Sequence, residues 1–166
     1  MSIIKANEEL ELYIDQLMDI EQNYNPKLRK TADEKRELYT SPNSLILLWL
    51  KEQKVLGERS GLSIKDIDEE ELIALIPNYT QYCASNALYV HSFTVRPEYR
   101  GQGLGKELAL AFIKKAKEMG YSRIIGHARE GASKHINEIF GSTIIKSFEN
   151  WYETREIYYF HDLVLM

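Results

Sequence analysis

Apolar residues recur with the period of a helix over residues 7–24 and again from Leu104, and local end signals predict three shorter helices. In the first stretch they form one continuous stripe, and Asn7 is placed to cap the helix. A second helix opens on Thr31 and Glu34, which have the spacing of a capping box, and Asp68 with Glu71 repeats that spacing. The predicted helices cover residues 7–24, 31–39, 68–76, 104–119 and 133–140.

Runs rich in strand-forming residues alternate with these helices. The first two runs, 44–50 and 55–60, flank a short polar turn and predict a hairpin. The order of helices and strands predicts an α+β fold with a mixed sheet. A length of 166 residues suits one domain, over residues 1–166. The predicted strands cover residues 44–50, 55–60, 87–95, 123–128, 143–148 and 157–165.

Composition and charge argue against several classes of protein. Hydrophobic residues make up 44% of the chain and charged residues 28%, as in a domain with a real core rather than a disordered chain. The net charge of −4 does not favour nucleic-acid binding, which needs clustered Lys and Arg. The longest apolar run, Leu45–Leu50, is too short to cross a membrane. We therefore expect no nucleic-acid partner and no membrane association.

Cysteine and histidine usage adds further expectations. Cys83 is the only cysteine, so no intramolecular disulfide can form, and we expect a buried apolar side chain rather than a nucleophile. Residues 1–11 lack the apolar stretch of a signal peptide, so we expect a cytoplasmic location. The histidines lack metal-binding spacing, and no metal is expected. These histidines are His91, His127, His135 and His161.

The segment that carries chemistry joins the predicted strand 87–95 to the helix that begins at Leu104. Between them three glycines stand at alternate positions: Gly101, Gly103 and Gly105. Without side chains in the way, successive backbone N–H groups can face one point, and the first turn of the helix adds unpaired donors and a positive dipole end. The turn therefore predicts a pyrophosphate cradle. The alternative is a glycine-rich turn that binds nothing.

Two common phosphate-binding loops do not fit this turn. The dinucleotide-binding pattern requires a third glycine where the chain has Lys106. The P-loop requires Ser or Thr after Gly105 and Lys106, where the chain has Glu107. A different phosphate-binding motif must therefore account for the glycines.

Residues 95–105, VRPEYRGQGLG, closely resemble motif A of the GNAT superfamily of N-acetyltransferases, matching it at every fixed position. The predicted order of elements is similar to that family's fold. The resemblance implies a mixed, mostly antiparallel sheet, flanked by helices and splayed at the motif-A strand. It implies acetyl-CoA, or another acyl-CoA, as co-substrate and a primary amine as acceptor, either a small molecule or a protein or peptide amine. It leaves a homodimer open.

The resemblance also assigns residues to the co-substrate. Ser133 takes the place of the Asn that often opens the later helix in the family, and Ser can also cap a helix. Where the family carries a Tyr as general acid, this chain has Ile139 and Phe140, so the thiolate can leave through water. The residues implied to hold pantetheine and pyrophosphate are Phe93, Thr94, Val95, Arg100, Gly101, Gln102, Gly103, Leu104, Gly105 and Lys106.

His91 is the candidate general base. An acceptor amine must lose a proton, imidazole titrates near neutral pH, and some arylalkylamine-acetylating members of the family have a histidine here. The alternative is a hydrogen-bonded histidine with a structural role. Tyr89 shares its strand face and is a candidate substrate contact, as are Trp151 and Tyr152 in a loop that overlooks the acceptor site of the resembled fold. The acidic run Asp66–Glu71 either attracts a cationic amine or is a solvated helix start.

Three functions remain open from the sequence. The first is an enzyme that moves an acetyl group from acetyl-CoA to a primary amine by direct attack in a ternary complex. The second is a non-catalytic acyl-CoA-binding or sensor domain of the same fold, suggested by the missing Tyr. The third is an adaptor that binds no ligand, which stabilisation by CoA would exclude.

Overall fold

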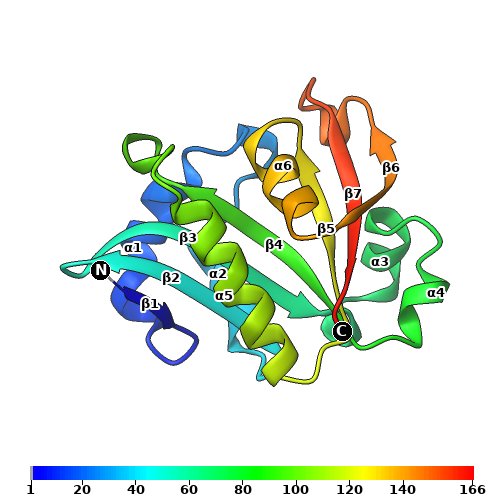
Figure 1. The fold of residues 1–166 in the computed structure, drawn as a ribbon, viewed down its shortest axis with the longest axis horizontal. Coiled ribbons are helices and arrows are strands. Elements are labelled where there is room, and N and C mark those ends of the chain that lie inside the picture. The colour runs from blue at the N-terminus through cyan, green and yellow to red at the C-terminus, as the bar shows by residue number, and fades with distance from the viewer. Residues whose placement is uncertain (1) are drawn as a thin grey trace.

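One seven-stranded sheet organises residues 2–166, the part of the chain that the computed structural model describes (Figure 1). The strand order is β1-β2-β3-β4-β5-β7-β6, and only β4 and β5 pair in parallel. The α+β class and the mixed, mostly antiparallel sheet are therefore confirmed. The strands are β1 (Ser2–Lys5), β2 (Ser44–Lys51), β3 (Lys54–Ser63), β4 (Ala87–Val95), β5 (Arg123–Arg129), β6 (Thr143–Phe148) and β7 (Tyr158–Val164).

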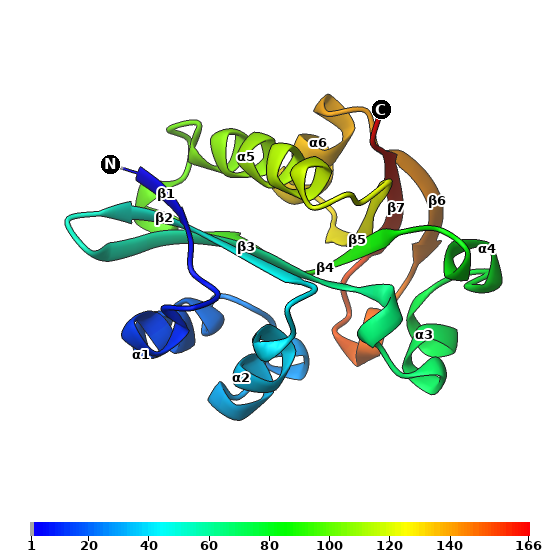
Figure 2. The ribbon, with the colours of Figure 1, turned by 90° about the horizontal axis from the view of Figure 1, so that it is seen from below.

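Helices cover both faces of the sheet, as Figure 2 shows. Helices α1 and α2 pack on one face, with α3 and α4 further along that side, and α5 and α6 pack on the other. The α-helices are α1 (Leu10–Glu21), α2 (Ala32–Thr40), α3 (Glu69–Leu75), α4 (Thr80–Cys83), α5 (Leu104–Glu118) and α6 (Ala132–Ile139). The 3₁₀ turns are η1 (Pro26–Leu28), η2 (Ile64–Asp66), η3 (Pro97–Tyr99) and η4 (Trp151–Glu153).

The apolar run in β2 is explained by burial on both faces. Successive side chains of a strand point to opposite faces. Leu45, Leu47 and Trp49 pack into the core beneath α5, whereas Ile46 and Leu48 pack into the core beneath α1. Strand β2 is therefore covered on both faces of the sheet. None of the described helices is long and apolar enough to cross a membrane.

The N-terminal segment differs from the prediction. Residues 2–5 form the edge strand β1, which is too short to show a sequence pattern. The first helix begins at Leu10 rather than at residue 7, and it ends at Glu21. Asn7 does not cap it: its Oδ1 accepts from the Ile46 backbone N–H at 3.0 Å, and its Nδ2 donates to Ser44 Oγ at 2.7 Å. Asn7 instead fastens the chain to β2, a contact between distant segments that local pattern cannot show.

The other helix ends follow their signals in part. Thr31 and Glu34 form the predicted capping box. Asp68 stands at the N-cap of α3, but its side chain accepts no capping hydrogen bond, so the second capping box is wrong. Gly120 follows α5 with φ +84°, the left-handed conformation expected of a glycine there. Helix α4 has no sequence signal, and Cys83 at its end is exposed rather than buried.

Candidate functional site

The glycine turn between β4 and α5 is open towards solvent. Gly101 has φ +77° and Gly103 has φ +86°, and a Cβ built on either would have no atom within 4 Å. Gly105 differs from these two, since its Cβ would lie 2.9 Å from Ile136 Cδ1 of α6, the end of a side chain that would have to shift. Among the described residues, nothing accepts a hydrogen bond from the backbone N–H groups of residues 101–105, which suits an anion.

Strands β4 and β5 separate beside this turn. They pair from Ala87 and Arg123 as far as Val90 and Gly126, and no further. The register of β4 with β3 also shifts at this point, which leaves His91 without a β3 partner. The splay predicted for this strand is therefore present, and it exposes backbone groups along one edge of β4.

A cavity of about 780 Å³ opens into this gap. Gln102 alone of the predicted site residues does not line it. The predicted residues that do line it are Tyr89, His91, Phe93, Thr94, Val95, Arg100, Gly101, Gly103, Leu104, Gly105, Lys106, Ser133, Trp151 and Tyr152. The structure thus brings the glycine turn, the open edge of β4 and the aromatic loop together, although their roles stay predictions.

Two loops far apart in sequence meet over one end of the cavity. The α1–α2 loop and the β6–β7 loop both line it. Asn25 Nδ2 donates to the Thr154 carbonyl oxygen at 3.2 Å, and Lys27 pairs with Glu153 at 3.2 Å. These contacts join the loops, so the cavity is framed by segments that the sequence does not link.

The sequence matches the model of the acetyltransferase (GNAT) family over residues 14–135. The chain belongs to the GNAT family of acetyltransferases. The match begins within α1 and ends within α6, so it includes the glycine turn and the open edge of β4 but not the β6–β7 loop.

Solved structures of GNAT proteins share the whole fold at low identity. The Salmonella typhimurium protein YncA, solved with its cofactor acetyl-CoA, is 16% identical, with 100% of this chain and 94% of that chain covered and a TM-score of 0.70. An aminoglycoside 6′-N-acetyltransferase from Enterococcus faecium is 13% identical, with coverages of 100% and 98% and a TM-score of 0.72. The ribosomal-protein-alanine N-acetyltransferase of Brucella melitensis is 16% identical, with coverages of 99% and 100% and a TM-score of 0.70.

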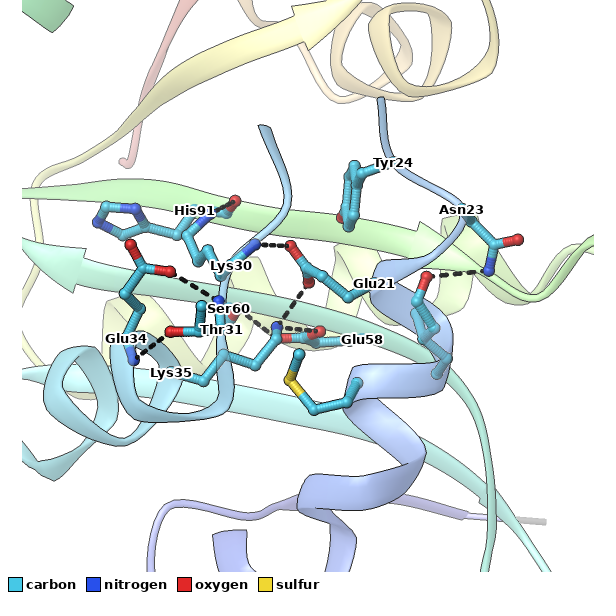
Figure 3. Close-up of polar contacts among 12 residues, drawn as sticks. Glu21, Asn23, Tyr24, Lys30, Thr31, Glu34, Lys35, Glu58, Ser60 and His91 are labelled. Atoms are coloured by element: carbon cyan, nitrogen blue, oxygen red, sulfur yellow. Dashed lines mark hydrogen bonds and ion pairs between the residues drawn. The ribbon is translucent and has the colours of Figure 1, made fainter. Parts of the chain in front are cut away.

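A buried charge cluster supports the α1–α2 loop of this GNAT protein (Figure 3). Lys35 lies between two carboxylates, with Glu21 Oε2 and Glu58 Oε2 each 3.1 Å from its Nζ, and all three side chains are buried. Burial opposes the charge on Lys35, but Glu58, Tyr39 and Glu21 outweigh it and raise its pKa. The other oxygen of Glu21 accepts from the Lys30 backbone N–H at 2.8 Å. The cluster therefore fixes the backbone where the loop enters α2.

The same loop sends two side chains to the open edge of β4. The Tyr24 hydroxyl accepts from the Phe93 backbone N–H at 2.9 Å. The Lys30 Nζ donates to the His91 carbonyl oxygen at 3.4 Å, a long hydrogen bond. Burial and nearby Glu58 raise the pKa of Tyr24, so its hydroxyl stays protonated at neutral pH. Loop side chains thus reach the edge that β5 leaves unpaired.

His91, predicted from the sequence as a general base that titrates near neutral pH, lies in an environment that lowers its pKa. Burial, followed by the charges of Lys30 and Lys35, lowers the pKa of His91 to about 3. Its Nε2 is buried without a partner among the described residues, and its ring lies edge-on to that of Tyr89, with centroids 5.0 Å apart. The ring is neutral at neutral pH and can accept a proton, but as a weaker base than a free histidine.

An arginine without a carboxylate partner lies on the α5–α6 side of β4. Arg59 is 2% exposed, and its guanidinium stands 4.4 Å from the Phe93 ring centroid. Its Nη2 donates to Asn137 Oδ1 at 3.1 Å, whereas Nε and Nη1 have no partner in the described chain. Asn137 Nδ2 in turn donates to His161 Nε2 at 3.1 Å. Burial alone lowers the pKa of Arg59 to about 9, so it is a cation at neutral pH.

Aromatic side chains form the wall below the β6–β7 loop. The ring of His127 stacks on Trp151 with centroids 4.1 Å apart, and Tyr89 Oη lies 2.8 Å from His127 Nδ1. Tyr152 is 51% exposed and has a left-handed φ of +46°, a strained conformation for an aromatic residue. The loop therefore holds Trp151 against the wall and presents Tyr152 at the cavity.

Two expectations for α6 have different outcomes. Ser133 does not cap the helix, because Gly131 occupies the N-cap and Ser133 Oγ donates to the Arg129 carbonyl oxygen at 3.3 Å. Helix α6 carries no tyrosine, as the sequence shows.

Six further residues line the cavity that the sequence did not mark as site residues, because each one has the local pattern of an ordinary loop, strand or helix residue. They are Tyr24, Lys30, Arg59, His127, Asn137 and His161.

Within residues 2–166, no three His, Cys, Asp or Glu side chains gather in a group that could hold a metal ion.

Proposed function

We propose that this protein is an N-acetyltransferase that moves an acetyl group from acetyl-CoA to a primary amine by direct attack in a ternary complex. One observation carries the proposal: a row of free N–H groups at residues 101–105 lies beside the open edge of β4, in one cavity. An anion-binding turn next to unpaired strand groups suits a ligand with a pyrophosphate at one end and amide groups along its arm. Family membership adds support.

The co-substrate would take the following positions. The pyrophosphate would accept hydrogen bonds from the N–H groups of residues 101–105, with Arg100 and Lys106 adding positive charge at the rim. Arg100 Nε donates to the Val95 carbonyl oxygen at 2.9 Å, which holds its side chain beside the turn. The pantetheine arm would follow the β4 edge at Phe93, Thr94 and Val95, and Ser133 would border it from α6.

The reaction would take place where the loops meet β4. The Phe93 N–H would polarise the thioester carbonyl once that oxygen replaces the Tyr24 hydroxyl as its acceptor. The amine nitrogen attacks the carbonyl carbon, the C–S bond breaks, and the electron pair leaves on sulfur. His91 would receive the amine proton, directly or through water, and the charge of Arg59 favours the departing thiolate.

The acceptor would enter on the side lined by Tyr89, Trp151 and Tyr152, opposite the turn. Glu71 of the acidic run also lines the cavity, and burial followed by the charge of Asp68 raises its pKa. A carboxylate and aromatic rings suit a cationic amine. GNAT neighbours named for aminoglycosides and for a ribosomal-protein alanine support either a small-molecule or a protein amine as acceptor.

Steady-state CoA release tests the proposal. Acetyl-CoA is incubated with a panel of primary amines that includes aminoglycosides, polyamines and peptides with free N-termini, and the acetylated product is identified by mass. We expect at least one amine to release CoA in step with its own acetylation. Saturable acetyl-CoA binding without turnover on any amine would favour the sensor alternative, for which the tyrosine-free α6 is the supporting observation.

The proposal also covers domain organisation, location and oligomeric state. We take residues 1–166 as one domain, since all seven strands share one sheet. A cytoplasmic location rests on the single cysteine, whose exposed thiol suits a reducing compartment. A homodimer stays open, and sedimentation of the purified chain measures it directly.

A further inference from the structure

We propose that Lys30 is an internal acetyl acceptor: without an external amine, the protein transfers the acetyl group of acetyl-CoA to the Nζ of its own Lys30. This inference rests on the proposed function, because it needs acetyl-CoA in the cavity. It assigns a modification site to a side chain outside the motif-A turn.

The position of the Lys30 amine carries the inference. Lys30 lines the cavity, and its Nζ donates to the His91 carbonyl oxygen on the open edge of β4. The Phe93 N–H, which would hold the thioester oxygen, lies two residues further along the same strand. An amine must be held beside the thioester for attack, and a backbone carbonyl is a suitable acceptor for its N–H groups. Lys30 thus places a primary amine at the open edge of β4 (Figure 3), beside the position proposed for the thioester.

Hydrogen bonds fix the loop backbone at Lys30. The Lys30 backbone N–H donates to Glu21 Oε1, and the other Glu21 oxygen is held by the buried Lys35. The capping box of Thr31 and Glu34 fixes the next turn of the chain. With the backbone held at both sides, only the side chain of Lys30 has to move towards the thioester, which raises the effective concentration of the amine.

The charges around Lys30 favour its reactive form. Among the residues that the structure describes, the Lys30 Nζ forms no ion pair. Burial lowers the pKa of Lys30, Glu21 opposes that shift, and Lys35 adds to it. The neutral amine, which is the nucleophile in acyl transfer, is therefore a larger fraction of Lys30 than of an ordinary exposed lysine. The charged and titratable groups around it are Glu21 on α1, Glu34 and Lys35 on α2, Glu58 on β3, Glu71 on α3 and His91 on β4.

The step is balanced without another reagent. The Nζ lone pair forms the N–C bond to the thioester carbon, the C–S bond breaks, and CoA leaves as the thiolate. The amine proton passes to the thiolate or to water. The product is an amide, which cannot pass its acetyl group on, so modification stops at one acetyl group per chain at this site.

Mass spectrometry of the intact protein and its peptides tests the proposal. Purified protein is incubated with acetyl-CoA and no amine, and acetylation is followed at Lys30 and at Lys27. Lys27 is the internal control, because it lies on the same loop but is exposed, so it reports uncatalysed acylation. We expect Lys30 to be acetylated at least about tenfold faster than Lys27. Lys30→Arg should remove the fast-forming acetyl group.

Two glycine variants tie the modification to the bound co-substrate. Gly103→Glu blocks the turn and should lower the Lys30 rate to that of Lys27. Gly120→Glu introduces the same side chain at a similar left-handed φ, outside the cavity, and should leave the Lys30 rate unchanged.

Calorimetric titration of the same samples with acetyl-CoA separates binding of the co-substrate from acetylation of Lys30. Binding of acetyl-CoA with Lys30 acetylated no faster than Lys27 would overturn the internal acceptor and leave the proposed function standing. Absence of acetyl-CoA binding would overturn both.

Discussion

The Tyr24 hydroxyl accepts a hydrogen bond from the backbone N–H of Phe93, at 2.9 Å. Tyr24 lies in the α1–α2 loop and Phe93 on β4, so a loop side chain takes the place that a paired strand would otherwise fill. The separation of β4 from β5 beyond Val90 and Gly126 is what leaves this N–H free for another acceptor. In the proposed complex, the thioester oxygen would compete with Tyr24 for the same donor.

Removing the Tyr24 hydroxyl should therefore strengthen acetyl-CoA binding. Tyr24→Phe keeps the ring but removes the competing acceptor, and one hydrogen bond corresponds to about 0.5–1.5 kcal/mol. We expect acetyl-CoA to bind about 2- to 10-fold more tightly by calorimetry. Free CoA, which has no acetyl carbonyl, is the matched ligand and should bind as to wild type. Equal effects on both ligands would contradict the competition.

The buried cluster beneath the loop should be sensitive to loss of its cation. Lys35→Met leaves Glu21 and Glu58 buried without a cation to pair with, which costs about 3–5 kcal/mol in comparable clusters. Urea unfolding measures the change. Lys27→Met, which breaks the exposed pair with Glu153, should cost less than about 1 kcal/mol. Similar losses for the two variants would show that the cluster contributes little.

The free energy of unfolding should fall as the pH drops below about 6.5. Burial lowers the pKa values of His91, His127 and His161 to about 3 each. Between about pH 6.5 and about pH 3 these histidines are protonated in the unfolded chain but stay neutral in the folded chain. Each histidine therefore lowers the free energy of unfolding by up to about 1.4 kcal/mol for each unit that the pH falls. His127→Phe, which retains an aromatic ring against Trp151, should reduce the slope by about a third. An unfolding free energy that is flat from pH 7 to pH 5 would contradict these shifts.

The pH profile of acetyl transfer should not show the titration of an ordinary histidine. From the sequence alone, His91 as base predicts an inflection near its usual pKa of about 6.5. Because its pKa is lowered to about 3, we expect kcat/KM to follow the ionisation of the acceptor amine. Profiles of wild type and His91→Gln with one amine provide the measurement. An inflection near pH 6.5 in wild type that His91→Gln abolishes would contradict the lowered pKa.

Features formed by consecutive residues could be predicted from the sequence, whereas contacts between distant segments could not. The strand 87–95, the glycine turn and the helix after it are consecutive, so their chemistry can be read from one segment. Tyr24 and Lys30 reach β4 across more than sixty positions of sequence, and no local pattern marks either as a site residue. Arg59 lies in the run 55–60 that predicts a strand, and nothing in that run marks it as buried; the structure buries it beneath α5 and α6.

Calorimetric titration with acetyl-CoA tests the proposed anion site at the glycine turn most directly. Wild type and Gly120→Glu should bind one equivalent with similar affinity. Both glycine variants strain a left-handed residue at about 1–2 kcal/mol, but only Gly103→Glu puts a carboxylate where the pyrophosphate would lie. We expect Gly103→Glu, shown to be folded by circular dichroism, to lose at least about 100-fold in affinity. Folded Gly103→Glu that binds acetyl-CoA as Gly120→Glu does, or a wild type that does not bind it, would contradict the account.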